Sequence, residues 1–295
     1  MNNGEYVEWE YRGWQFGAWK ISSINPTPPS KVVIAFHGFD RKAKEMENFM
    51  PLYDSSTSML SISLLHHGSS KPLPPIPLKE PLSPKLLIDA IESYIGLENV
   101  RLELLGYSMG ARIALKLFQD YPDKFFRIIS LAPDGLKMGR FYKFIVNTSI
   151  GRFTWGVVDK YPKINRFILD ASRSLRIISD HKHHFGRFHT DNPEIRKRVA
   201  YGWVGHKEFW PEENKLANVL NENVSSEKTV YFIFGNRDKI IPFSWSIPLQ
   251  KKLKQLRSND SNIKEIYFLK VPCGHVMRHP DIVELIKEKI WQTIG

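Results

Sequence analysis

The segment GYSMG at residues 106–110 places a serine between two glycines, where an apolar run changes to a helical pattern. The preceding VRLEL reads as a strand, and MGARIALKLF repeats apolar residues at helical spacing. A Gly-x-Ser-x-Gly turn lifts the hydroxyl of Ser108 clear of the sheet, at a helix N-terminus whose dipole favours a developing anion. These features suit a nucleophile, whereas the alternative is a serine that only caps the helix.

A serine hydroxyl is a weak nucleophile and needs a base that is itself supported by an acid. His275 follows the predicted strand YFLKVPCG, and Asp238 follows VYFIFGN, so both side chains are expected at the same sheet edge as Ser108. The alternatives are a surface or capping role for His275 and a turn role for Asp238. Asp134, in LAPDG, is the second candidate for the acid.

The segment HGFD at residues 37–40 also follows a buried apolar strand. An oxyanion needs two inward N–H donors, and the amide of Met109, just after the serine, is one candidate. The amide of Phe39 is the other, because Gly38 lets the loop turn inward. We expect the ring of His37 to brace this loop by hydrogen bonding.

Strands and helices alternate along most of the chain at the spacing of parallel crossover units, which predicts an α/β fold with a doubly wound, mostly parallel sheet. The opening segment YVEWEYRGWQFGAWKIS reads as an antiparallel hairpin at a sheet edge. The alternation stops between residues 136 and 224, where the pattern is helical and rich in aromatic residues. We therefore expect a core formed by residues 1–135 and 225–295, with residues 136–224 inserted as a helical cap.

In order and spacing, AFHGFD, LLHHGSS, LLGYSMGARIAL, FGNRDKIIP and VPCGHVM resemble the α/β-hydrolase superfamily. The resemblance implies an α/β-hydrolase fold of about eight strands. It also implies Ser108 as nucleophile, Asp238 as acid, His275 as base, and the amides of Phe39 and Met109 as the oxyanion hole. Where many relatives carry D-x-x-G-x-G-x-S, this chain has LLHHGSS, which puts a structural hydrogen bond there in doubt.

The resemblance further implies that a serine at the elbow argues against epoxide hydrolases and haloalkane dehalogenases, which use an aspartate. We expect a serine hydrolase that cleaves a carboxylic ester or thioester through an acyl-enzyme, with no metal and no organic cofactor. The alternatives are a carbon–carbon bond hydrolase or a cofactor-free lyase with the same triad, and a ligand receptor with an idle triad. The histidines of HKHHFGRFHT show no metal-ligand spacing and are expected in an exposed basic loop.

The net charge of +11 is concentrated in one segment. Between Lys137 and Lys207, 15 lysines and arginines stand against 5 acidic residues, a net charge of +10. This basic cap would fit an anionic or amphiphilic acyl substrate, or an anionic membrane surface. We favour a third interpretation for most of its residues, in which the aromatics form the cap's core and the charges are solvated. The chain lacks a nucleic-acid recognition motif.

The apolar fraction of 42% and charged fraction of 25% are those of a globular protein. The sequence has no apolar run long enough for a membrane span, and its N-terminus lacks the features of a signal peptide. A single cysteine excludes an internal disulfide framework. From these features we expect a cytoplasmic protein.

Overall fold

The computed structural model describes residues 4–25, 30–73, 81–96, 100–224, 228–256 and 265–293. Its strands form one sheet in the order β1-β2-β4-β3-β6-β7-β8-β9, and β5 pairs with β2. From β4 to β9 in this order, neighbouring strands are parallel. The strands are β1 (Glu5–Tyr11), β2 (Trp14–Ile21), β3 (Ser30–Phe36), β4 (Thr57–Ile62), β5 (Lys71–Pro72), β6 (Val100–Tyr107), β7 (Phe125–Leu131), β8 (Thr229–Gly235) and β9 (Ile266–Val271).

The predicted edge hairpin is present. β1 and β2 pair antiparallel from Glu5 with Lys20 to Tyr11 with Trp14. The two residues between them, Arg12 and Gly13, both have positive φ, as tight two-residue hairpin turns require. The candidate site lies on the six parallel strands beside this hairpin.

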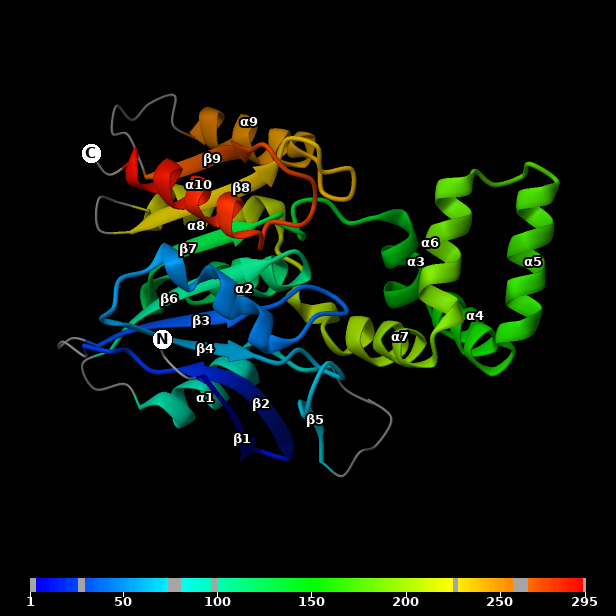
Figure 1. The fold of residues 1–295 in the computed structure, drawn as a ribbon, viewed down its shortest axis with the longest axis horizontal. Helices are drawn as coiled ribbons and strands as arrows, with labels where there is room; N and C mark the ends of the chain where they lie inside the picture. The colour runs from blue at the N-terminus through cyan, green and yellow to red at the C-terminus, as the bar shows by residue number, and fades with distance from the viewer. Residues whose placement is uncertain are drawn as a thin grey trace.

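Helices cover both faces of the sheet (Figure 1). On one face η1 packs against α10, and on the other α1, α2, α8 and α9 pack in succession. Most apolar residues of β3, β6 and β8 are buried between the two layers, as expected for strands covered on both sides. The helices of these layers are η1 (Ala43–Leu52), α1 (Pro84–Ile95), α2 (Met109–Asp120), α8 (Glu213–Asn223), α9 (Ile247–Leu256) and α10 (Pro280–Trp291).

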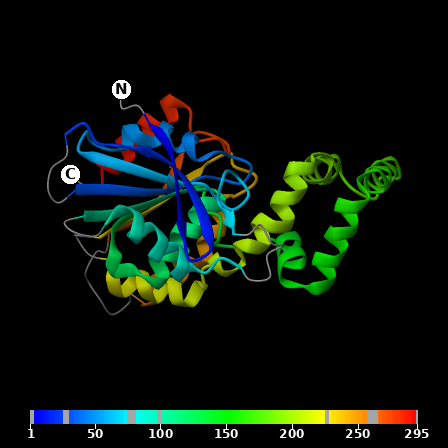
Figure 2. The same ribbon diagram turned by 90° about the horizontal axis from the view of Figure 1, so that it is seen from below.

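The chain between β7 and β8 is helical throughout its described elements, and its residues 140–209 project beyond the carboxyl ends of the parallel strands (Figures 1 and 2). These elements are α3 (Arg140–Asn147), α4 (Ser149–Lys160), α5 (Pro162–Ser174), α6 (Asp180–Asp191), α7 (Pro193–Lys197), the π-helix η3 (Arg198–Trp203), η4 (Lys207–Phe209) and α8. We call residues 140–209 the helical arm. α8 lies within the predicted insertion of residues 136–224 but packs on α2 and α9. The predicted domain limits stay a prediction.

A buried arginine joins the helical arm to the core. The guanidinium carbon of Arg112, on α2, lies 4.6 Å from the ring centre of Tyr142 and 4.7 Å from that of Trp210. The same guanidinium lies 3.8 Å from the carboxylate of Asp134, at the end of β7. A cation over an aromatic face is attracted to it, so Arg112 joins Tyr142 at the start of the arm, and Trp210 directly after its end, to helix α2.

No helix in the described part of the chain is both long and apolar enough to cross a bilayer.

Candidate active site

The turn between β6 and α2 holds Ser108 in a strained conformation. Its φ is 54° and its ψ is −120°, a region that residues with a side chain rarely adopt. The amide of Ser108 donates to the carbonyl of Leu131 at 2.9 Å, which fixes the turn to β7. The side chain therefore stands at the carboxyl edge of the sheet, as predicted.

The two glycines of the elbow are required by close backbone contacts. A Cβ at Gly106 would lie 2.3 Å from the Cα of Ala111, and one at Gly110 would lie 2.0 Å from the carbonyl oxygen of Phe36. Neither contact can be relieved by a side-chain movement, because both involve backbone atoms. The glycines thus allow the helix to approach β3 and β6.

We expect Gly110→Ala to destabilise the protein by about 3 kcal/mol, because the added methyl group meets the rigid backbone of β3. Gly156, on the exposed side of α4, is the matched control, because a Cβ added there would have no atom within 4 Å. Gly156→Ala should raise stability by up to about 1 kcal/mol through helix propensity. Urea unfolding of both variants measures the difference. Equal midpoints would contradict the tight elbow.

Ser108, His275 and Asp238 form one hydrogen-bonded chain. His275 Nε2 lies 3.1 Å from Ser108 Oγ, and His275 Nδ1 lies 2.8 Å from Asp238 Oδ2. The second carboxylate oxygen of Asp238 accepts the amides of Ile240 and Ile241 at 2.8 and 3.0 Å. Asp134, the second candidate for the acid, instead lies against Arg112. The structure thus brings together the three residues that the sequence singled out.

The environment of Asp238 favours its charged form. Burial alone would raise the pKa of this carboxyl, but the hydrogen bonds from His275 and from two backbone amides outweigh burial and hold the pKa below its usual value. An ionised Asp238 accepts the Nδ1 hydrogen of His275, which leaves Nε2 as the nitrogen with a free lone pair. His275 is then oriented to take a proton from Ser108.

Tyr107 positions the loop that carries His275, a contact that the sequence interpretation missed. Its hydroxyl donates to the carbonyl oxygen of His275 at 2.7 Å. Burial raises the pKa of this phenol to about 12, so the hydroxyl keeps its proton. The only sequence indication was its place directly before Ser108, which is consistent with a side chain on the same edge of the sheet.

The HGFD loop lies against Ser108. A Cβ at Gly38 would be 3.3 Å from the Cβ of Ser108. Within the described ranges, the amides of Phe39 and Met109 have no hydrogen-bond acceptor in the protein. An oxyanion requires two such free N–H donors, so these two amides stay the predicted oxyanion hole.

Two neutral histidines hold this loop in place. His37 Nδ1 donates to the Gly38 carbonyl at 2.8 Å, and its Nε2 accepts the Leu64 amide at 3.0 Å. His67 donates from Nδ1 to the carbonyl of Leu65 and accepts the amide of Asp40 at 3.0 Å. His37 thus braces the loop as expected. His67 belongs to LLHHGSS, the segment that departs from the family pattern. Its ring forms a hydrogen bond with the HGFD loop, through the amide of Asp40.

The side chain of Phe39 connects the site to the helical arm. Its ring centre lies 5.9 Å from that of His189 on α6 and 5.5 Å from that of Trp203 on η3. Asp40 forms an ion pair with Arg198, which also donates to the carbonyl oxygen of His66. The arm therefore contacts the loop that carries one proposed oxyanion donor.

The expectation of an exposed basic loop at HKHHFGRFHT was wrong. The segment forms helix α6, and His183 and His189 are buried within it. Ser179 caps the helix by accepting the amide of Lys182, and Asp170 of α5 pairs with His183 at 2.7 Å. The sequence suggested an exposed loop because this segment contains many charged residues. In the structure, several of these residues pair with residues of α5. Among the described residues no three His, Cys, Asp or Glu side chains are grouped as a metal site.

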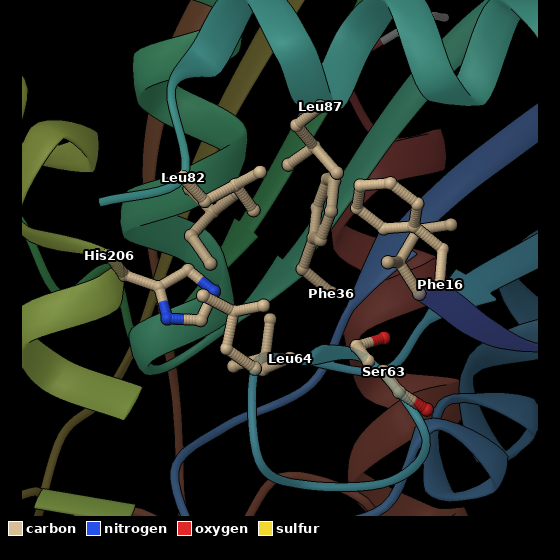
Figure 3. A pocket seen from close by; sticks show the side chains of 11 residues that line it. Phe16, Phe36, Ser63, Leu64, Leu82, Leu87 and His206 are labelled. Carbon is tan, nitrogen blue, oxygen red and sulfur yellow. The ribbon is translucent and has the colours of Figure 1, made fainter. Parts of the chain in front are cut away.

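A small cavity lies beneath the loop of His67, lined by residues that include Phe36, Leu64 and His206 (Figure 3). Its volume of about 10 Å³ is room for one water molecule at most. It is too small to hold an acyl chain and belongs to the packing behind the site.

A family model described as the alpha/beta hydrolase fold matches residues 86–277, well over half of the chain. This range contains Ser108, Asp238 and His275. The chain belongs to the α/β-hydrolase family. The mostly parallel sheet with helices on both faces confirms the prediction of an α/β-hydrolase fold.

Solved structures share this α/β-hydrolase fold over nearly the whole chain at low identity. An alpha/beta hydrolase enzyme from a Medee basin deep-sea metagenome is 14% identical, with a TM-score of 0.63, over 98% of this chain and 97% of that one. The thioesterase domain from the curacin biosynthetic pathway is 14% identical, with a TM-score of 0.58, over 98% and 100%. A haloalkane dehalogenase from Bradyrhizobium elkani is 14% identical, with a TM-score of 0.58, over 99% of each. A search of curated proteins found no match.

The buried histidines make this α/β hydrolase sensitive to acid. Desolvation lowers the pKa of His67 to about 4 and that of His206 to about 3, against about 6.5 in an unfolded chain. At a pH between the native and the unfolded pKa values, the unfolded chain binds more protons at these histidines than the native protein does. The free energy of unfolding therefore decreases as the pH falls below about 6.5. From pH 7.5 to pH 5 we expect these two groups to reduce the free energy of unfolding by about 4 kcal/mol.

Urea unfolding at the two pH values measures this loss. His206→Gln should reduce the difference in unfolding free energy between the two pH values by about 2 kcal/mol, because this ring no longer titrates. His279→Gln, which changes an exposed histidine, is the control and should leave the difference unchanged. A His206→Gln variant with the full pH dependence would show that this ring does not stay neutral in the native protein.

Proposed function

We propose that this α/β hydrolase is a serine hydrolase that cleaves a carboxylic ester or thioester through an acyl-enzyme on Ser108. The observation that carries the proposal is the continuous hydrogen-bonded chain from Asp238 through His275 to Ser108. Ser108 is the only one of the three that can act as a nucleophile at the elbow. An aspartate, which the resemblance implies for epoxide hydrolases and dehalogenases, does not occupy this position.

In the first half of the proposed reaction, His275 Nε2 takes the proton of Ser108 as Oγ attacks the substrate carbonyl carbon. The carbonyl oxygen becomes an anion, which the amides of Phe39 and Met109 stabilise. His275 then gives its proton to the leaving alcohol or thiol as the bond to the acyl carbon breaks. Asp238 remains ionised and stabilises the imidazolium throughout.

In the second half, water attacks the acyl carbon and His275 takes a proton from it. The tetrahedral intermediate collapses, the carboxylic acid leaves, and the proton returns to Ser108 Oγ. The protein's own groups supply every proton transfer. The rings of Phe39, His189 and Trp203 make the neighbourhood of the loop aromatic, which favours an apolar acyl group over a polar one.

A fluorophosphonate probe and an ester panel test the proposal. The probe should label Ser108 in the folded protein, which peptide mass spectrometry can locate. The panel would contain p-nitrophenyl esters from acetate to palmitate and the corresponding coenzyme A thioesters. Turnover of at least one series is expected. Labelling without any turnover would favour the carbon–carbon hydrolase or lyase, and absence of both would favour a receptor with an idle triad.

A further inference from the structure

Helix α5 presents its charged side to the protein. Arg166 pairs with Asp191, Arg173 pairs with Asp180, and Asp170 pairs with both His183 and Arg187. All these partners lie on α6, which packs beside α5. The contact between the two helices therefore depends largely on ion pairs, whereas a helix on a globular surface ordinarily packs through its apolar side.

The apolar side of α5 is consequently exposed. Ile164, Phe167, Ile168 and Leu175 recur at helical spacing and are 58%, 73%, 55% and 71% exposed. α5 has no buried residue, and in Figure 1 it is the outermost helix of the arm. We call these four residues the outer patch. Bulky apolar side chains grouped on one face mark a surface that has a binding partner.

Helix α4 also exposes apolar side chains. Ile150, Phe153 and Val157 recur on one face and are exposed, while Trp155 on the opposite face is buried. α4 meets α5 at a corner. Each of the two helices thus exposes an apolar face.

Cations flank the outer patch. Lys163 and Arg176 are exposed and pair with no carboxylate in the described part of the chain, and Lys160 lies over the ring of Tyr161. They belong to the segment with a net charge of +10. A second copy of the chain would bring the same positive charge against this face, whereas an anionic surface is complementary to it.

We propose that the outer patch and its cations dock the protein on an anionic lipid bilayer. The apolar side chains of α5 would enter the boundary between headgroups and acyl chains, while the lysines and Arg176 contact lipid phosphates. The arm is then the surface-binding element of a protein whose candidate active site lies at the other end of the same arm. This inference is independent of the proposed activity.

Sedimentation with lipid vesicles tests the proposal without an activity assay. The wild-type protein should bind vesicles that contain phosphatidylglycerol and phosphatidylcholine at least tenfold more tightly than vesicles of phosphatidylcholine alone, and added salt should weaken the binding. The double variant Phe167→Glu/Ile168→Glu should lose at least tenfold of the affinity. Trp291→Glu is the matched control, because Trp291 is 65% exposed but lies on α10 of the core.

A pair of charge variants separates the patch from the general basicity of the chain. Lys160→Glu/Lys163→Glu should weaken binding about tenfold, whereas Lys251→Glu/Lys254→Glu, on exposed positions of α9, should change it little. Circular dichroism confirms that each variant is folded. Equal losses in both pairs, or wild-type protein that does not bind anionic vesicles, would overturn the proposal.

Light scattering after size exclusion decides between the bilayer and a second copy. A monomer is expected for the wild type in the absence of lipid. A dimer that dissociates in Phe167→Glu/Ile168→Glu would show that the outer patch is a subunit interface, and the membrane proposal would then be wrong.

Discussion

Ser108→Ala is expected to lower kcat/KM for the best ester of the panel by about 10⁵-fold, because the acyl-enzyme can no longer form. Stability should change by less than about 1 kcal/mol, since alanine meets the same positive φ and only one hydroxyl is lost. Initial rates and urea unfolding of the same preparation measure both quantities. Turnover within tenfold of the wild type would remove Ser108 from the reaction.

Ser93→Ala is a matched control for the loss of a hydroxyl. Ser93 donates to the carbonyl of Ala90 within α1 and has no contact with the site. Its replacement should leave turnover unchanged, so a drop in both variants would indicate a general effect on folding.

Asp238→Asn is expected to lower kcat by about 10⁴-fold with little change in KM. An asparagine can offer its amide hydrogens to His275 Nδ1, which stabilises the tautomer with the proton on Nε2. That tautomer cannot take the proton of Ser108. Steady-state kinetics with the same ester measures the effect.

Asp134→Asn makes the same change at the second candidate for the acid. Because Asp134 contacts Arg112 and not His275, we expect kcat within about threefold of the wild type. The opposite result, in which Asp134→Asn is inactive and Asp238→Asn is active, would assign the acid to the end of β7.

Much of the fold could be predicted from the sequence, because local pattern and tertiary position agree there. The apolar run before His37 is buried between two helical layers, and the glycines around Ser108 are required by backbone contacts of about 2 Å. The carboxyl ends of parallel strands also lie at the same edge of the sheet, so residues that directly follow such strands are expected near one another. For this reason the convergence of Ser108, Asp238 and His275 could be expected, although their roles stay a proposal.

The helical arm could not be predicted in the same way. Charged residues on a helix usually face water, so the sequence of α6 suggested an exposed loop, and nothing in it shows that its acids and arginines face α5. The contacts of Tyr107 with the His275 loop, and of His67 with Asp40, join segments far apart in the chain. These contacts depend on tertiary packing, and no periodic pattern in the local sequence predicts them.

The loop of Phe39 and Asp40 has one further consequence. The backbone amide of Phe39 is a proposed oxyanion donor, while its ring lies against His189 and Trp203, and Asp40 forms an ion pair with Arg198. The position of this proposed donor thus depends on the arm as well as on the sheet. Any rotation of the arm, whatever brings it about, would first alter the hydrogen bond to the oxygen atom of a bound carbonyl.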